Sequence, residues 1–122
     1  MDSIFFDTKN HEFATRNILF DSAEPKVPIS VIAQVTRRCN LDCKFCSESE
    51  QFPDPSLTDL EQLRDKLDGV KRVYLSGGEP LLREDIFDVI KLYKGSFDVL
   101  GLPTNCTLLS EEICQKLRGR VS

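Results

Sequence analysis

The sequence predicts an α/β fold built from three successive strand–loop–helix units, and three observations support this. After residue 28, runs rich in β-branched residues alternate with segments whose apolar residues recur at helical spacing. Polar residues suited to cap a helix stand before these segments, and glycines follow them. The intervening loops are short. Because each helix returns the chain to the same end of the sheet, we expect the three strands to lie parallel.

The first unit begins with a strand over Ile29–Thr36, where β-branched residues dominate and apolar side chains fall on every second position. A loop that carries three cysteines follows it. The next helix is expected to start at Thr58, which can form a capping box with Glu61, and to end at Gly69.

The second and third units repeat this plan. Each has a short apolar strand, a loop and an amphipathic helix that ends at a glycine. The expected elements are strand Val73–Leu75, helix Arg83–Lys94, strand Phe97–Leu102, loop Pro103–Leu109, and a helix that starts after the N-cap Ser110 and runs to Gly119.

Residues 1–28 are expected to form an N-terminal leader segment, and residues 29–122 the α/β unit. In the leader, the apolar patches Ile4–Phe6 and Ile18–Phe20 are expected to pair as a hairpin or to pack as a flap. Three parallel strands with helices on one side leave two edges and one face open. The unit is therefore expected to be part of a larger barrel, or to dimerise or swap strands with a second copy.

Composition excludes some functions for the 122 residues. The chain carries 16 Lys and Arg against 20 Asp and Glu, a net charge of −4, which disfavours nucleic-acid binding. No apolar run reaches the roughly 20 residues of a membrane span, and the start lacks a signal peptide, so a cytoplasmic protein is expected. Five cysteines, three of them within eight residues, favour metal or redox chemistry over a disulfide framework.

The loop after the first strand contains Cys39, Cys43 and Cys46 in a C-x3-C-x2-C arrangement. Three thiolates on a 4Fe-4S cluster leave one iron open to a small molecule, whereas structural zinc takes four protein ligands. Two alternatives remain at this point. The loop could bind zinc with Cys106, Cys114 or His11 as the fourth ligand, or the thiols could be unligated.

A second motif, Ser-Gly-Gly-Glu-Pro, follows the second strand. Two glycines let the backbone approach a ligand closely, Glu79 offers a carboxylate, and Pro80 stiffens the turn before the helix. By itself the segment is also typical of a plain strand-to-helix turn. Both motifs stand at the carboxyl ends of predicted strands, where α/β barrels place their active sites.

Together the segments Cys39–Cys46 and Gly77–Pro80 resemble the radical S-adenosylmethionine (radical SAM) superfamily. The resemblance implies an enzyme whose 4Fe-4S cluster, held by Cys39, Cys43 and Cys46, binds S-adenosylmethionine at its open iron. Reductive cleavage then gives methionine and a 5'-deoxyadenosyl radical. It also implies that the chain is the N-terminal half of a six-unit barrel.

The resemblance assigns further site residues. Phe45 would pack beside the adenine, or else serve loop packing, and Gly77, Gly78 and Glu79 would bind the methionine amino group with the help of backbone carbonyls. Ser76 would line the site. Further residues expected at the cofactor pocket or substrate are Thr104 and Asn105.

Four further residues, two cysteines and two arginines, carry their own interpretations. Cys106 stands where the family commonly has glycine. We expect this residue to lie in the core, and the alternative is that its thiol faces the substrate. Cys114 is also expected to lie in the core. Arg37 and Arg38 either offset the negative charge of the cluster or are solvated.

The resemblance also bears on substrate and partners. The motifs are most similar to members that mature peptides or build cofactors such as molybdopterin and haem derivatives, with flavodoxin or ferredoxin as electron donor. A homodimer or a complementary barrel half is the expected protein partner. The alternative function is a non-catalytic module that binds zinc or a cluster for structure, or that oligomerises through its open sheet.

Overall fold

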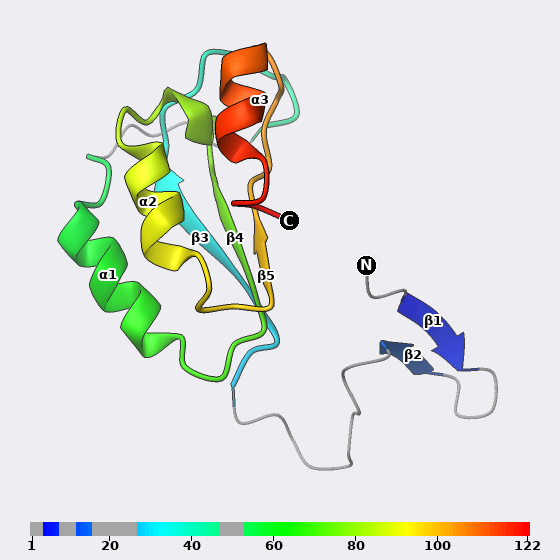
Figure 1. The fold of residues 1–122 in the computed structure, drawn as a ribbon. Helices are drawn as coiled ribbons and strands as arrows, with labels where there is room; N and C mark the ends of the chain where they lie inside the picture. The colour runs from blue at the N-terminus through cyan, green and yellow to red at the C-terminus, as the bar shows by residue number, and fades with distance from the viewer. Residues whose placement is uncertain (1–3, 8–11, 16–26, 47–52) are drawn as a thin grey trace.

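The computed structural model describes residues 4–7, 12–15, 27–46 and 53–122 of the chain. Figure 1 shows two separate sheets, a two-stranded hairpin and a three-stranded sheet with helices packed against it. The elements in chain order are β1 (Ile4–Asp7), β2 (Glu12–Thr15), β3 (Ser30–Thr36), α1 (Leu57–Lys66), β4 (Arg72–Gly77), the 3-10 helix η1 (Pro80–Leu82), α2 (Ile86–Tyr93), β5 (Val99–Gly101) and α3 (Glu111–Leu117).

The main sheet has the order β3-β4-β5, and both strand pairs are parallel. Val31 lies opposite Val73, which in turn lies opposite Leu100, so the apolar positions of the three strands line up on one face. The alternation predicted for the first strand therefore places its buried side chains on the same face as those of its neighbours. The prediction of three parallel strands alternating with helices is confirmed.

The core lies between this face and the helices α1 and α2 (Figure 1). Its fully buried members come from both layers: Ala33, Val35, Val73 and Leu75 from the strands, and Leu60, Val89, Ile90 and Tyr93 from the helices. On the opposite face Ile32 remains 74% exposed. Within the described residues the sheet is thus covered on one face only, as the sequence led us to expect.

The first strand of the N-terminal hairpin pairs with a different segment from the one predicted. β1 pairs with β2 antiparallel, with Phe6 opposite Phe13. The predicted hairpin is therefore confirmed for Ile4–Phe6, but its second strand is Glu12–Thr15. The patch Ile18–Phe20, like His11, lies outside the described residues.

Helix α1 begins earlier than predicted because Ser56, and not Thr58, is its N-cap. The Ser56 hydroxyl accepts a hydrogen bond from the Asp59 backbone N–H at 3.1 Å, and the Asp59 carboxylate accepts one from the Ser56 backbone N–H at 2.9 Å. The Ser56 hydroxyl also donates a 2.7 Å hydrogen bond to the Asp59 carboxylate, and this bond, together with the one from the Ser56 backbone N–H, lowers the pKa of Asp59 below its ordinary value. The expected box between Thr58 and Glu61 is wrong, and the expected stop at Gly69 is also wrong, because α1 ends at Lys66 with Leu67 as its C-cap. Gly69, with a left-handed φ of 84°, lies in the turn that follows.

Other boundaries also differ from the sequence-based prediction. Helix α2 begins at Ile86 and not at Arg83, because Pro80–Leu82 forms a 3-10 helix and Arg83 returns to extended backbone. Strand β5 covers only Val99–Gly101. The cap of α3 is confirmed, since the Ser110 hydroxyl accepts a hydrogen bond from the Ile113 backbone N–H.

Cys114 does not lie in the core as predicted. It is exposed, and it lines a mainly apolar groove of about 570 Å³ together with Leu102, Leu109, Leu117 and Val121. The prediction failed because α3 has no fully buried residue, and Cys114 lies with Leu117 where the helix lines this groove. Within the described ranges, no helix has the length and apolar character needed to span a lipid bilayer.

Tyr93 offers a test of how the two covering helices are joined. Its buried hydroxyl donates a 2.8 Å hydrogen bond to the carbonyl of Leu60 in α1, and burial raises the pKa of the phenol above 10.0. Tyr93→Phe removes this link and should lower the free energy of unfolding by about 1 kcal/mol. Urea unfolding followed by circular dichroism measures the change.

The matched control is Tyr74→Phe, since the hydroxyl of half-buried Tyr74 donates no hydrogen bond to a described residue. Its effect should be clearly smaller. Equal losses in the two variants would show that the hydrogen bond between the helices adds nothing to stability.

Candidate functional site

The candidate site lies where the three parallel strands end. The loop with the cysteines follows β3, the Gly-Gly-Glu-Pro turn follows β4, and the loop with Thr104 and Asn105 follows β5. Parallel strands bring their carboxyl ends to one edge of a sheet, and this edge is where open α/β sheets bind ligands. The fold therefore brings together the three segments that the sequence singled out separately.

Asp54 ties together the two ends of the cysteine loop. Its carboxylate accepts a 2.8 Å hydrogen bond from the Thr36 hydroxyl and forms a 2.9 Å ion pair with Arg38. Burial acts to raise the pKa of Asp54, but the hydrogen bonds from Thr36 and Arg38, with the charges of Arg38 and Arg83, outweigh burial and hold that pKa below its ordinary 3.8. Arg38 is therefore paired with a carboxylate and not simply solvated, and its role in offsetting the charge of a cluster stays a prediction.

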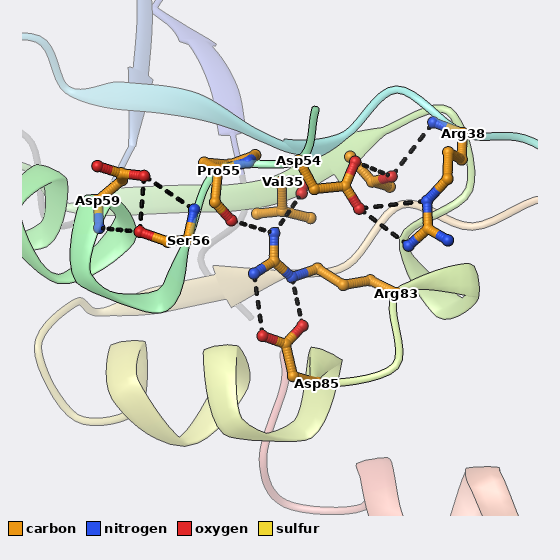
Figure 2. A network of polar contacts seen from close by, with 9 residues as sticks. Val35, Arg38, Asp54, Pro55, Ser56, Asp59, Arg83 and Asp85 are labelled. Atoms are coloured by element: carbon orange, nitrogen blue, oxygen red, sulfur yellow. Dashed lines mark hydrogen bonds and ion pairs between the residues drawn. The ribbon is translucent and has the colours of Figure 1, made fainter. Parts of the chain in front are cut away.

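A buried arginine from the second unit holds the same two ends. Figure 2 shows the Arg83 guanidinium between the backbone carbonyls of Val35 and Pro55, with hydrogen bonds of 2.7 Å to each. Its remaining nitrogens form a two-pronged ion pair with Asp85, at 2.6 and 3.0 Å. The side chain is only 5% exposed, and its charge is matched by the Asp85 carboxylate.

The two glycines of the second motif are needed by the protein's own backbone. The Gly78 N–H donates to the carbonyl of Thr36, and the Glu79 N–H donates to the carbonyl of Arg38. A Cβ at Gly77 would overlap the Thr36 carbonyl, and one at Gly78 would overlap the Arg38 carbonyl. The expected reason for these glycines was close approach to a ligand, whereas here they permit close approach of the cysteine loop.

Glu79 is fully buried and connects the second loop to the third. Its Oε1 accepts hydrogen bonds from the Thr104 hydroxyl at 2.8 Å and from the Leu81 backbone N–H at 3.0 Å. Its Oε2 accepts one from the Asn105 backbone N–H at 2.7 Å. A buried carboxylate with three donors is well satisfied, so Glu79 both caps η1 and fixes the turn after β5.

Cys106 adopts a left-handed backbone, with φ of 67°, at the position where glycine was expected. The two preceding side chains support this conformation: the Thr104 hydroxyl accepts from the Cys106 N–H, and the Asn105 Oδ1 accepts from the Thr107 N–H. Cys106 is exposed, so its predicted place in the core is wrong. The turn projects this residue away from the packed layers.

The three predicted ligands lie together in sequence but are not gathered around one point. Cys39 and Cys46 are exposed, Cys43 is half-buried, and none of them forms a disulfide. In the described part of the chain, no three His, Cys, Asp or Glu residues are arranged to hold a metal ion. Their role as metal ligands stays a prediction.

Phe45 and Ser76 occupy different environments. Phe45 is 93% exposed, so loop packing does not account for this aromatic ring. Ser76 is half-buried at the end of β4, opposite Gln34 of β3. The contacts of either residue with a cofactor stay predictions.

Sequence reasoning missed Asp54, Arg83 and Asp85. Asp54 lies between two prolines, a pattern that indicates only a loop, and Arg83 was placed at the start of a helix. One signal was available, since an arginine that precedes two acidic residues shortly after a Gly-Gly-Glu-Pro turn can form a local ion pair. The two carbonyls that Arg83 binds come from β3 and from the segment before α1, and no local pattern reveals them.

An open parallel α/β sheet with three free thiols in the loop after its first strand is typical of barrel-related proteins that bind a cofactor at the carboxyl ends of their strands. The family model described as "Radical SAM superfamily" matches residues 33–121, and the chain belongs to this superfamily. Enzymes of this family use a 4Fe-4S cluster and S-adenosylmethionine.

Several curated relatives are similar to the chain. Pre-heme d1 synthase of Dinoroseobacter shibae is 42% identical over 83 residues, which cover 63% of the chain and 20% of that protein. GTP 3',8-cyclase of Sulfurovum sp. is 40% identical over 95 residues, covering 69% and 28%. The GTP 3',8-cyclase of Sulfurimonas denitrificans is 37% identical over 112 residues, covering 83% and 34%. The chain thus spans about a fifth to a third of these relatives.

The hydrogen bond and ion pair of Asp54 with Thr36 and Arg38 predict that stability depends on pH. Because the folded state lowers the pKa of Asp54, its ionised form stabilises the fold above about pH 3.8, and this contribution is lost as the pH falls further toward the folded-state value. The difference in unfolding free energy between wild type and Asp54→Asn should be constant near neutrality and shrink below about pH 3.8. Urea titrations at several pH values measure this difference. A difference that persists unchanged at the lowest pH would show that the ionised Asp54 carboxylate does not stabilise the fold.

The left-handed turn predicts opposite effects for two substitutions. Cys106→Gly relieves a conformation that costs an ordinary residue about 1 kcal/mol, and it should leave stability equal or raise it by up to about that amount. Cys106→Val should lower stability by about 1 kcal/mol or more, since β-branched residues tolerate positive φ poorly. Denaturation midpoints compare the pair. Loss of stability in the glycine variant would mean that the Cys106 thiol contact with the Thr104 carbonyl outweighs the strain.

Proposed function

We propose that this chain is the cluster-binding part of a radical SAM enzyme, in which Cys39, Cys43 and Cys46 hold a 4Fe-4S cluster. The observation that supports this most is the position of the three free thiols, in one loop whose two ends are held by Asp54 and Arg83. The donor set fits the cluster, because thiolates are its usual protein ligands and three of them leave one iron open. The loop would close around the cluster as it binds.

The bound cluster would supply one electron to cleave the sulfonium bond of S-adenosylmethionine, which yields methionine and a 5'-deoxyadenosyl radical. The chain's own residues would hold and orient this cofactor. We assign the contact with its amino group to the turn Gly77–Glu79, mainly through backbone carbonyls, because the Glu79 carboxylate is buried with three donors. Exposed Phe45 would pack on the adenine.

The remaining pocket residues would have supporting roles. Ser76 would line the site from the end of β4, and Thr104 and Asn105 would shape its side after β5. All three come from the edge of the sheet that carries the cysteine loop.

The substrate that we propose is a precursor in cofactor biosynthesis. The relatives named pre-heme d1 synthase and GTP 3',8-cyclase support this class, and peptide maturation receives no support from their names. Since the chain matches about a third or less of those relatives, the proposed enzyme needs further βα units, from a longer chain, a second copy or a complementary partner, to close the barrel. A low-potential protein such as flavodoxin or ferredoxin would deliver the electron. Free thiols that bind a cluster favour a reducing compartment such as the cytoplasm.

Anaerobic reconstitution with iron and sulfide tests this proposal. The chain should take up about four irons, and its charge-transfer absorption should change on addition of S-adenosylmethionine. Replacing any one of Cys39, Cys43 or Cys46 with Ser should strongly reduce the iron content. Cys114→Ser is the matched control, since Cys114 is an exposed thiol outside the loop, and it should retain the iron.

Two outcomes would overturn the proposal. Uptake of one zinc per chain with no response to S-adenosylmethionine would favour a structural metal module. Equal iron loss in Cys114→Ser and in the loop variants would show that iron binds thiols without selecting the loop.

A further inference from the structure

The third loop reaches the first cysteine through the side chain of Asn105. The Asn105 Nδ2 donates a 3.0 Å hydrogen bond to Asn40 Oδ1 and lies 3.9 Å from Cys39 Sγ, within hydrogen-bonding distance of sulfur. Asn40 in turn donates to the Thr107 hydroxyl at 2.8 Å. A side chain 66 positions away in sequence thus lies against the sulfur of a proposed cluster ligand.

The orientation of the Asn105 carboxamide is determined by its other partners. Its Oδ1 accepts hydrogen bonds from both the backbone N–H and the hydroxyl of Thr107, at 3.0 and 2.7 Å. A flipped carboxamide would turn its NH₂ group toward the Thr107 N–H donor and its oxygen toward Asn40 Oδ1. The NH₂ group is therefore the part that faces Cys39.

The backbone of Asn105 is fixed as well. Its N–H donates to buried Glu79, and the neighbouring Thr104 hydroxyl donates to the same carboxylate. The donor that faces Cys39 is consequently held by contacts from all three loops. Such a preorganised N–H group loses little freedom when it bonds to sulfur.

We propose that Asn105 is a positioning residue that donates a hydrogen bond to the Cys39 sulfur and thereby raises the reduction potential of the cluster bound there. This inference rests on the proposed function, and it adds a role in tuning the cluster to a residue assigned so far only to the pocket. Hydrogen bonds to cluster sulfur atoms are among the factors that set the potential, because they favour the more negative reduced form. The Leu41 backbone N–H, 3.5 Å from the same sulfur, acts in the same direction.

The test is an EPR-monitored redox titration of the reconstituted chain without S-adenosylmethionine. In Asn105→Ala, the ratio of reduced to oxidised cluster at a fixed potential should fall about threefold, since one hydrogen bond to sulfur is lost. Thr107→Val is the matched control. It removes a hydroxyl of the same network that does not touch the sulfur, while the Thr107 N–H still orients Asn105, so its titration should match the wild type.

A second variant covers the case in which Asn105→Ala fails to hold the cluster. Asn40→Ala removes the nearer acceptor of the Asn105 NH₂ group and leaves sulfur as its partner, so the reduced fraction should rise. An unchanged titration in Asn105→Ala, or an unchanged or lower reduced fraction in Asn40→Ala, overturns this inference and leaves the proposed function standing. A wild-type chain that takes up no iron overturns the proposed function and this inference with it.

Discussion

The candidate site depends above all on the buried guanidinium of Arg83. Its charge is matched by Asp85, and its other donors bind the carbonyls of Val35 and Pro55, which stand on the two sides of the cysteine loop. An arginine suits this position because its planar fork donates four hydrogen bonds here, two to the carboxylate and two to carbonyls, whereas a lysine has only three donors. The two sides of the loop are therefore held together, and the cysteines start from a defined edge of the sheet.

The second constraint is the close contact between the first and second loops. The hydrogen bonds from the N–H groups of Gly78 and Glu79 to the cysteine loop exist only because Gly77 and Gly78 have no Cβ. Glu79 then extends the connection to the third loop through Thr104 and Asn105. The Gly-Gly-Glu-Pro motif, which is associated with cofactor binding, thus also connects the loops after all three strands. A substitution in this motif is therefore expected to disturb all three loops.

The sequence predicted the repeating architecture well, because it is encoded locally. Alternation over Ile29–Thr36 and the Ser110 cap need only neighbouring residues to be recognised. The predictions failed where nearby residues compete for one role, as when Ser56 displaced Thr58 as the cap of α1. They also failed for Cys106 and Cys114, whose burial depends on what packs around the third unit. The motifs identified the loops of the site, but Asp54 and Arg83 act through contacts that no local spacing reveals.

The distribution of charge explains why hydrogen bonds matter at this edge. A cluster held by three thiolates carries negative charge, and the nearby cations Arg38 and Arg83 are each paired with a carboxylate. A paired arginine contributes little net positive potential, because the field of its partner largely cancels its own. Donors without formal charge, namely the Leu41 N–H and the Asn105 NH₂ group, reach Cys39 directly. These polar N–H groups would stabilise negative charge on this sulfur, and their effect depends on the geometry of the loops that hold them.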